Sequence, residues 1–568
     1  MVSVSPFCLL CYCLSVWSAS AAFTKSPQAQ FEVRGLEDLV PAFDSFEGEM
    51  FAGTLPLAHP SVEEGEEGEY MFWLFEPEAP AVDDSLIIWF NGGPGCTAFS
   101  AGLFFEMGPI TIPLRPAGTL TGPDELHAPL GPNPYGWHKA SAVMYVEQPV
   151  NVGFSEGPHD PVNETDIGRA MDGFLQHFVH VFEAYKDKRI FLVGESYAGM
   201  YVPSMAHYIH ERNKQGRPDD EVDIKLGGIA LGNGWVDAIG QGGTVIDWAW
   251  WHGLIDSVTK DSLYREWDHC VLKGKTEPAP FHPYTVPDEC GMMGVVAKAA
   301  GAGLLPRGLA PNVYDMSTWD PYDLINKYST IDEFFNNHEI QKALNVPKHF
   351  DGVWMGCIPG AGRRLEEDTK PRMLRQHFPE HLLDQDRPES MKSWMIDLLD
   401  DAKIPVLVYN GDRDATCNSV GSEIFLDGLD EWSGIGDWKD PEGYKRGIWV
   451  SDPEDDGQAI SGYAKEVKNL QFVIVYNSGH LVPYNRPVAA LDLITRLLEG
   501  QSYVDKVIEP IIVDVTLPDD SDDGHDTPRR RWLETILAMI VAFAGGYFVS
   551  RFQHRKSDGY QSVPSISL

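Results

Sequence analysis

The amino-acid sequence predicts an α/β fold in which a mostly parallel central sheet has helices on both faces. Short apolar runs, each typical of a buried strand, recur at residues 70–76, 85–91, 142–147, 190–193, 225–231, 404–409 and 470–476. Amphipathic segments lie between several of these runs. The clearest covers residues 166–185, where Met171, Phe174, Phe178 and Phe182 recur at helical spacing. Strands that alternate with helices are typical of a parallel sheet.

The alternation fades between residues 236 and 332. This region has helical runs and proline-rich connectors, and it contains Cys270 and Cys290. We interpret it as an insertion that caps the active edge of the sheet. The last buried strand, at residues 470–476, is followed by an amphipathic terminal helix at residues 487–498.

The composition bounds the class of protein and its partners. The chain has 568 residues, of which 43% are hydrophobic, so it can bury a sizeable core. The formal net charge is −40, which argues against nucleic acid as a partner because phosphate binding needs a basic face. No metal-binding or nucleotide-binding motif is evident, and we expect no cofactor.

Both ends of the chain predict passage through the secretory pathway. Residues 1–22 combine an apolar run with small residues, as a signal peptide does. Residues 501–531 form an acidic linker, and residues 532–549 form an apolar stretch that would extend roughly 27 Å as a helix. We expect a single membrane span there, with an interfacial helix as the alternative. The bulk of the chain would then be lumenal, in the Golgi, an endosome or a vacuole, and residues 550–568 would be cytosolic.

Five cysteines remain once the expected signal peptide is removed: Cys96, Cys270, Cys290, Cys357 and Cys417. In an oxidising compartment an odd number implies two disulfides and one free thiol. Counting alone leaves the pairing open. The chain also has one N-glycosylation sequon, which begins at Asn163 before the amphipathic helix.

A serine lies at a sharp turn about one third of the way along the chain. The apolar run at residues 190–193 is followed by the turn sequence GESYAG and then by a helical segment from residue 200. This strand–turn–helix arrangement is the nucleophile elbow of α/β-hydrolases, in which the turn exposes the oxygen of Ser196. Ala198 stands where the G-x-S-x-G pattern has its second glycine, so the motif alone also fits an ordinary loop serine.

A nucleophilic serine needs a base, and the base needs a carboxylate that orients it. The strand at residues 404–409 leads into GDRD, which contains Asp412 and Asp414, and the strand at residues 470–476 leads into GHLVP, which contains His480. Open α/β sheets place their sites at the C-terminal ends of such strands. The order serine, aspartate, histidine is also that of the α/β-hydrolases.

Several motifs taken together resemble the serine carboxypeptidases. They are NGGPGC from Asn91, GESYAG from Gly194, GNGW from Gly232, GDRD from Gly411 and GHLVP from Gly479. The resemblance covers roughly residues 23–500, which we expect to form the catalytic domain. Within the family, the chain looks closest to the membrane-anchored Golgi carboxypeptidases that trim prohormone precursors in fungi. The resemblance implies an α/β-hydrolase fold and the release of C-terminal residues from peptides or proteins through an acyl-enzyme.

The resemblance assigns the catalytic roles. Ser196 would be the acylating nucleophile, and His480 the general base and then the general acid. Alignment with the family motif selects Asp414, not Asp412, as the residue that orients His480. The N–H groups of Gly93 and Tyr197 would form the oxyanion hole.

The family also implies a site for the C-terminal carboxylate of the substrate. It would consist of Asn91, the N–H of Gly92, and Glu195, with Glu106 hydrogen-bonded to Glu195. Two acids can bind a carboxylate only while they hold protons, so we expect peptidase activity to be best at acidic pH. The spacing from Cys96 to Glu106 is one residue longer than is usual in the family.

The resemblance further implies the pairing of the cysteines. Cys96 would pair with Cys357, which leaves Cys270 to pair with Cys290 inside the insertion. Cys417 would be a free thiol beside the substrate pocket, and we therefore expect sensitivity to mercurials.

Two features leave the substrate open. Asn151 stands where the family commonly has glycine, which could change the wall near the leaving residue. Trimming of C-terminal lysine or arginine is implied by the fungal branch, but Leu481 beside His480 offers no acid to a basic side chain, so the preference could be apolar. An acyltransferase of the same fold and a non-enzymatic protein are the alternatives.

Overall fold

The computed structural model describes residues 27–59, 68–111, 130–158, 161, 163–276, 292–301, 311–318, 331–357, 390–451 and 460–508. The chain divides into two units, Met1–Pro510 and Ile511–Leu568, and every described residue belongs to the first. The expected signal peptide, membrane span and tail, and most of the acidic linker, lie outside the described residues. Within those ranges, no helix is both long enough and apolar enough to cross a membrane.

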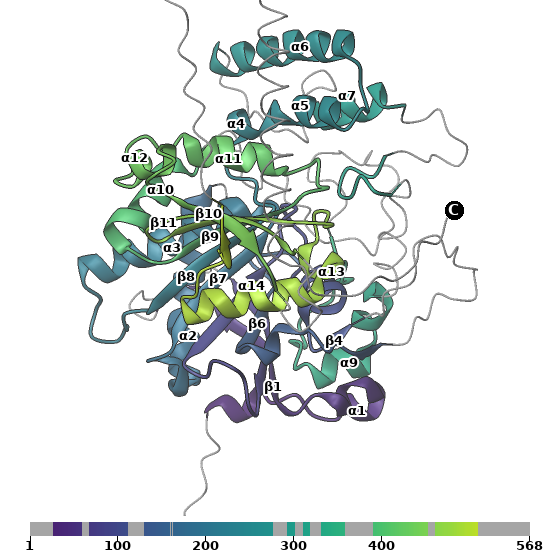
Figure 1. Ribbon diagram of the computed structural model, residues 1–568. Helices are drawn as coiled ribbons and strands as arrows, with labels where there is room; N and C mark the ends of the chain where they lie inside the picture. The colour runs from purple at the N-terminus through teal and green to yellow at the C-terminus, as the bar shows by residue number, and fades with distance from the viewer. Residues whose placement is uncertain are drawn as a thin grey trace, which may run out of the picture. The chain divides into compact units, whose positions relative to one another are not determined.

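The described part of the chain is built on an eleven-stranded sheet (Figure 1). Its order is β1 (Gly48–Pro56), β2 (Glu69–Pro77), β6 (Ala142–Val146), β3 (Ser85–Phe90), β7 (Arg189–Glu195), β8 (Leu226–Gly232), β9 (Val406–Gly411), β12 (Leu470–Val475), β11 (Gly462–Val467), β10 (Lys445–Trp449), β13 (Lys506–Val507). The six strands from β6 to β12 pair in parallel. The strands outside them pair antiparallel.

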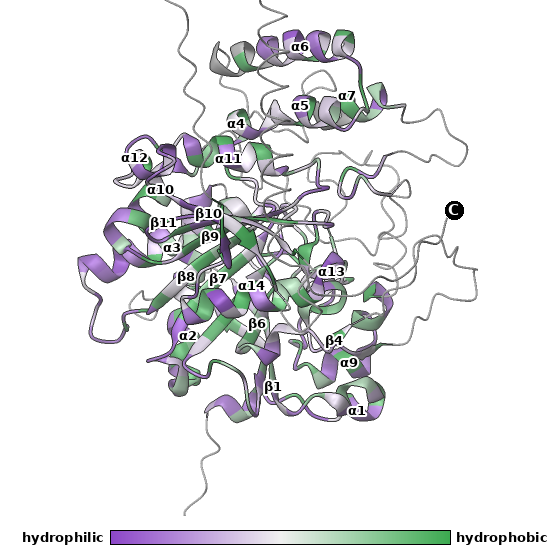
Figure 2. Ribbon diagram, in the orientation of Figure 1, coloured by the Kyte–Doolittle hydropathy of each residue, from purple (hydrophilic) through white to green (hydrophobic). Residues whose placement is uncertain are grey.

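Helices cover both faces of this sheet because its central strands are apolar on both sides. In β3, Leu86 and Ile88 face one core cluster, whereas Trp89 faces the other. Helices α2 (Glu164–Val181) and α3 (Ala198–Gln215) pack on the first face. The π-helix η3 (Phe99–Met107) and α14 (Pro487–Glu499) pack on the second. The hydropathy colouring shows the apolar strands of the sheet enclosed by helices with mixed faces (Figure 2).

The expected insertion contains a group of helices with a small core of their own. It comprises α4 (Ala238–Gly242), α5 (Thr244–Trp251), α6 (Ser257–Thr276) and α7 (Met292–Ala299). Buried side chains join these helices, among them Ile246, Trp248 and Leu263. Figure 1 shows α5, α6 and α7 grouped together beyond α11 (Ser419–Asp427). Helix α4 packs against α11, which follows β9, so the insertion contacts the part of the chain that carries Asp414.

The remaining short elements connect these layers. They are η1 (Pro27–Gln30), α1 (Leu36–Leu39), η2 (Pro41–Ser45), β4 (Ile110–Thr111), β5 (Gly131–Pro132), η4 (Trp137–Lys139), η5 (Glu183–Tyr185), α9 (His338–Ala343), α10 (Lys392–Asp397), η8 (Leu398–Ala402), α12 (Ile435–Lys439) and α13 (Val482–Asn485).

The sheet is more mixed than the sequence analysis predicts. Four of its strands, β1, β10, β11 and β13, have no counterpart among the predicted strands. Strand β1 contains Gly48 and Gly53, and β10 and β11 carry charged side chains, so none of the three is a continuous apolar run. These strands lie toward the edges of the sheet, where charged side chains are common. The predicted parallel arrangement holds for the six central strands.

Candidate active site

Ser196 lies at the tip of a tight turn between β7 and α3. Its φ angle of 64° is in the left-handed region, which is sparsely populated by residues with a side chain and often marks a functional site. Backbone hydrogen bonds hold the turn in place. The N–H of Ser196 donates to the carbonyl of Gly232 over 3.1 Å, and its own carbonyl accepts from the N–H groups of Gly199 and Trp235. A Cβ atom at Gly199 would lie 2.6 Å from the carbonyl oxygen of Trp235, so the last glycine of GESYAG permits this close approach.

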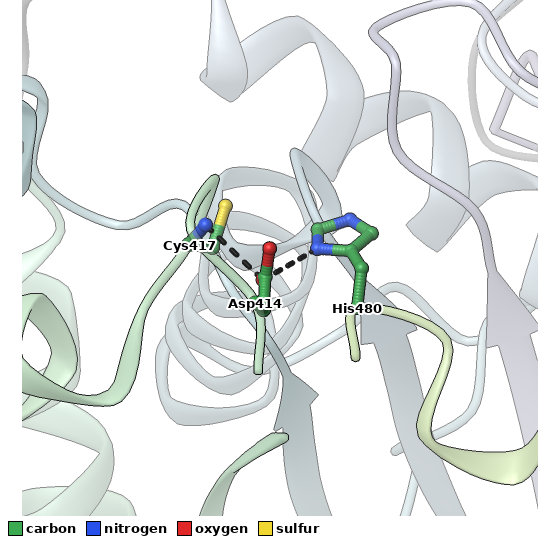
Figure 3. Close-up of side chains that lie close together, drawn as sticks. All are labelled: Asp414, Cys417 and His480. Atoms are coloured by element: carbon green, nitrogen blue, oxygen red, sulfur yellow. Dashed lines mark hydrogen bonds and ion pairs between the residues drawn. The ribbon is translucent and has the colours of Figure 1, made fainter. Parts of the chain in front are cut away.

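The residues proposed as base and orienting acid meet after two adjacent parallel strands. Nδ1 of His480 lies 2.7 Å from Oδ2 of Asp414, and both side chains are buried (Figure 3). Asp414 follows β9 and His480 follows β12, whose last residues are in register. Because Nδ1 is engaged by Asp414, Nε2 is the imidazole nitrogen that can take a proton from a nucleophile. Asp412 instead accepts from the N–H of Ser478 over 3.1 Å, so the structure pairs Asp414 with His480.

Three further donors fix the Asp414 carboxylate. Its oxygens accept from the N–H of Thr416 over 2.8 Å, from the N–H of Cys417 over 3.1 Å and from the side-chain amide of Asn233 over 2.8 Å. Asn233 is held in turn because its amide oxygen accepts from the N–H of Gly411. These hydrogen bonds hold the carboxylate in the orientation in which Oδ2 meets Nδ1 of His480.

Asn233 and Tyr314 belong to the site, and the sequence analysis does not identify either. Asn233 lies in GNGW directly after β8. Its place at the end of a buried strand is the sequence signal that could have identified it. The backbone carbonyl of Tyr314 accepts from the N–H of His480 over 2.7 Å, and the two rings lie 5.1 Å apart. Tyr314 comes from residues 311–318, where the sequence shows no motif or periodicity that would place it here.

The glycine loop after β3 lies directly against the serine turn. A Cβ atom at Gly92 would lie 2.3 Å from the backbone nitrogen of Tyr197 and 2.9 Å from Cβ of Ser196. Gly93 has a φ of 114°, which side chains rarely adopt. Tyr197 is the N-cap residue of α3, so its N–H belongs to the end of the helix that favours negative charge. Gly92 and Tyr197 thus lie next to Ser196, and Gly93 follows Gly92 in the same loop.

Two carboxyl groups lie buried together beside this loop. Glu106 and Glu195 are 2% and 3% exposed. Burial raises the pKa of Glu106 to about 7, against the lowering effects of Glu195, His480 and Asn91. Burial, together with the charge of the nearby Glu106, raises the pKa of Glu195 well above its usual range. At acidic pH both groups therefore hold protons.

Asn91 is oriented by its own neighbours. Its amide oxygen accepts from Nε1 of Trp89 over 2.9 Å and from the N–H of Gly102 over 3.1 Å. The NH₂ group of Asn91 is therefore the part of the side chain that acts as a donor, and it helps to stabilise the Glu106 carboxyl. Of the four residues expected to bind a substrate carboxylate, Gly92 and Glu195 thus adjoin Ser196, and Glu106 interacts with both Glu195 and Asn91.

The longer spacing between Cys96 and Glu106 coincides with an unusual helix. Residues Phe99–Met107 form the π-helix η3, in which the N–H of Leu103 donates to the carbonyl of Ala98 over 3.0 Å. A π-helix accommodates more residues per turn than an α-helix does, and π-turns are frequent at functional sites. The additional residue is compatible with Glu106 reaching Glu195.

The cysteine pairing can be followed in part. Cys96 and Cys357 form a disulfide, as the family resemblance implies. Cys417 is a buried free thiol, and burial with the nearby Asp414 raises its pKa well above the usual range. Cys417 is therefore protonated at neutral pH, and its position beside Asp414 and His480 is shown in Figure 3. Cys290 lies outside the described residues, so its expected pairing with Cys270 stays a prediction.

Two asparagines from the sequence analysis occupy defined backbone positions. Asn151 has a φ of 68°, and asparagine is one of the few residues that tolerate the left-handed region in which glycine is favoured. This explains how Asn151 can replace the usual glycine without a change of backbone. Asn163 is half-buried at the N-cap of α2, where its side chain accepts from the N–H of Asp166 over 2.9 Å.

The comparison with known families identifies the family of the chain. The model of the family described as serine carboxypeptidase matches residues 42–500. The chain belongs to the serine carboxypeptidase family. Ser196, Asp414 and His480 each follow a parallel strand of one sheet, which agrees with a hydrolase of this family, and the chain is a serine-type carboxypeptidase by membership.

Individual relatives support the same assignment. The chain is 30% identical to the pheromone-processing carboxypeptidase KEX1 of Yarrowia lipolytica over 447 residues, which cover 75% of this chain and 64% of that protein. It thus spans less than two thirds of that relative. It is 26% identical to the mouse lysosomal protective protein over 474 residues, which cover 76% of this chain and 88% of that protein.

The solved structures show the same fold. The crystal structure of a prohormone-processing carboxypeptidase from Saccharomyces cerevisiae matches with a TM-score of 0.68 and 24% identity, over 83% of this chain and 96% of that one. The α/β-hydrolase fold predicted from the sequence is confirmed by this likeness.

Proposed function

We propose that this serine carboxypeptidase releases C-terminal residues from peptides or proteins through an acyl-enzyme formed on Ser196. His480 takes the proton of Ser196 and then gives it to the leaving amino acid. Asp414 holds His480 in position and stabilises the imidazolium form. The observation that carries this proposal is the 2.7 Å contact between Nδ1 of His480 and Oδ2 of Asp414. Both residues follow parallel strands of the sheet whose strand β7 leads into the Ser196 turn.

The glycine loop supplies the stabilisation of the negative charge that develops on the substrate carbonyl. In this proposal the N–H groups of Gly93 and Tyr197 bind the oxyanion. Support comes from the close approach of Gly92 to the nitrogen of Tyr197, which leaves no room for a side chain between loop and helix. One donor of this kind contributes about 10²–10³ in rate.

The buried carboxyl pair makes the enzyme an exopeptidase. Protonated Glu195 donates to the terminal carboxylate of the substrate, together with Asn91 and the N–H of Gly92, while Glu106 shares its proton with Glu195. The raised pKa values of both acids support this role, because an ionised pair would repel the substrate. The same pair argues against the acyltransferase alternative, since a small acyl donor without a free C-terminus has no use for it.

The finer assignment concerns substrate and place. In this proposal the enzyme trims C-terminal lysine or arginine from precursors in the late secretory pathway. Residues 532–549 anchor it in a Golgi or endosomal membrane, with the catalytic domain in the lumen and Asn163 glycosylated. The support is the motif resemblance, the apolar and acidic composition of the C-terminal residues, and similarity to a carboxypeptidase that is named for pheromone processing.

Release of the last residue from N-blocked dipeptides tests this function. We expect free lysine or arginine to appear fastest at pH 5, and we expect Ser196→Ala to reduce kcat by about 10⁴-fold or more. The matched substrate carries a C-terminal amide, which removes the charge that the carboxyl pair binds. Fastest release of apolar residues would overturn the precursor-trimming assignment alone. Equal activity of the Ser196→Ala variant would overturn the proposed mechanism.

A further inference from the structure

Four groups of histidine, cysteine and carboxylate side chains in the described ranges bring ligand atoms within 4.8 Å of one another. Such a group can hold a metal ion only if no other cation already neutralises it and no other role needs its lone pairs. The group of Asp414, Cys417 and His480 is the catalytic one, and its Nδ1–Oδ2 contact is required for the orientation of the imidazole.

Two of the other groups already contain basic side chains. In the group of His59, Asp172 and Glu221, the buried guanidinium of Arg217 lies 2.6 Å from Asp172, and Arg212 lies 2.8 Å from Glu221. These two positive charges occupy the carboxylate oxygens and would repel a metal ion.

The third group is on the surface of α3 and consists of His210, Glu211 and Asp401. The ammonium of Lys214 forms an ion pair with the same oxygen of Asp401 that lies 3.0 Å from His210. A metal ion would have to displace this ammonium, so the group is already satisfied without one.

The fourth group, Glu69, Glu156 and His349, has no lysine or arginine partner among the described residues. Nε2 of His349 lies 3.2 Å from Oε1 of Glu69 and 3.0 Å from Oε2 of Glu156. Around an ion with bonds of about 2.1 Å, neighbouring tetrahedral or octahedral ligands are roughly 3.0–3.4 Å apart. Both nitrogen–oxygen distances therefore fit two ligands on one ion, and the three ligand atoms all lie within 4.8 Å of one another.

The backbone fixes the two glutamates side by side. Glu69 and Glu156 form an antiparallel bridge in which the N–H of Glu69 donates over 2.8 Å and the N–H of Glu156 over 3.2 Å. A Cβ atom at Gly68 would lie 2.4 Å from the carbonyl oxygen of Glu156, so glycine at this position permits the close approach of the two segments. Like charges directly opposite each other destabilise such a pair. A cation between them removes that repulsion.

The oxygens that face the imidazole lack other partners. Oε1 of Glu69 and Oε2 of Glu156 are shielded from solvent, and they accept no hydrogen bond from the part of the chain that the structure describes. Burial raises the pKa of Glu156, and Glu69 and Asp351 add to the effect while His349 opposes it. The three side chains line an open hollow of about 570 Å³, and His349 is 64% exposed, so an ion has access.

We propose that Glu69, Glu156 and His349 bind a divalent transition-metal ion, with Zn²⁺ as the representative case. One imidazole nitrogen and two carboxylate oxygens form a ligand set that Zn²⁺ accepts, and the remaining positions would be filled by water. The ion would join the start of β2, the segment after β6 and the segment that contains His349. Its role is to hold these segments together, and it takes no part in peptide hydrolysis.

Calorimetric titration of the metal-free full-length chain with Zn²⁺ at neutral pH tests the proposal. We expect His349→Ala and Glu156→Gln each to bind one Zn²⁺ ion fewer per chain than the wild type does, or to bind that ion at least about tenfold more weakly. Asp401→Asn, in the group that Lys214 already satisfies, is the matched control and should leave the titration unchanged. Cys417→Ser tests whether Zn²⁺ binds at the catalytic group instead. This variant should still bind the Zn²⁺ ion that is lost in His349→Ala.

Acidification provides a second measurement. Metal binding requires deprotonated ligands, so Zn²⁺ binding should release protons, and the affinity should fall steadily as the pH is lowered. Peptidase activity of the metal-free variants shows that they are folded. An unchanged titration in both ligand variants, or loss of that Zn²⁺ ion in Cys417→Ser alone, would overturn the site without affecting the proposed hydrolase.

Discussion

At the scale of single residues, the chemistry depends on two carboxyl groups that hold protons where most glutamates do not. Glu106 and Glu195 are buried together, and burial is the main cause that raises the pKa of each. Below the raised values both are neutral and can donate to a carboxylate. As the pH approaches 7, one of them ionises, and the negative charge then repels the C-terminus of the substrate.

The variant Glu195→Gln tests this carboxyl switch because an amide remains a neutral donor at every pH. In the wild type we expect KM for a peptide to rise from pH 5 to pH 7.5. In Glu195→Gln we expect a rise that is several-fold smaller, because one of the two titrating groups is gone. Initial rates over a range of substrate concentrations at each pH measure this. Identical pH profiles of KM in the two proteins would show that ionisation of Glu195 does not control the binding of the carboxylate.

At the scale of elements, the site is a contact between two tight turns. The turn at Ser196 ends β7, and the loop that contains Gly92 ends β3, its parallel neighbour. Parallel neighbours end at the same edge of the sheet, so residues that are about a hundred positions apart in sequence meet there. The contact leaves no space for a Cβ atom at Gly92.

Substitution of Gly92 by alanine should separate the two turns. The added Cβ would displace the nitrogen of Tyr197, and we expect kcat/KM to fall about 10²-fold or more, as for the loss of an oxyanion donor. Gly436→Ala is the control, since a Cβ there has no atom within 4 Å. Steady-state kinetics with thermal unfolding of both variants tests the prediction. A Gly92→Ala enzyme with wild-type kcat/KM would contradict the proposed oxyanion hole.

The sequence predicts those parts of the fold that have a recognisable local sequence pattern. The central strands are continuous apolar runs, and the glycine turns that follow them carry Ser196, Asp414 and His480. The edge strands have no such signature, because charged residues and glycines interrupt their apolar pattern. Asn233 and Tyr314 are not identified for a different reason. Tyr314 acts through a hydrogen bond to His480, far away in sequence, which only the folded chain reveals, and Asn233 has only its place after a buried strand as a signal.

At the scale of the whole molecule, the account requires that widely separated segments assemble around one serine. Ser196 follows β7, Asp414 follows β9 and His480 follows β12, and the sheet order places β8 between the first two strands. Residues directly after β8 connect these positions. The side-chain amide of Asn233 donates to Asp414, and the carbonyl of the preceding Gly232 accepts from the N–H of Ser196. The catalytic group thus depends on the complete central sheet.

Covalent labelling of Ser196 with a fluorophosphonate tests the central claim most directly, because the reagent reacts with a serine only when a base activates it. The account predicts one label per chain, located at Ser196 by mass spectrometry. It also predicts that the rate of labelling falls by orders of magnitude in His480→Ala, while the fold is retained. Labelling at another serine, or an equal rate in the His480→Ala variant, would contradict the proposed catalytic group.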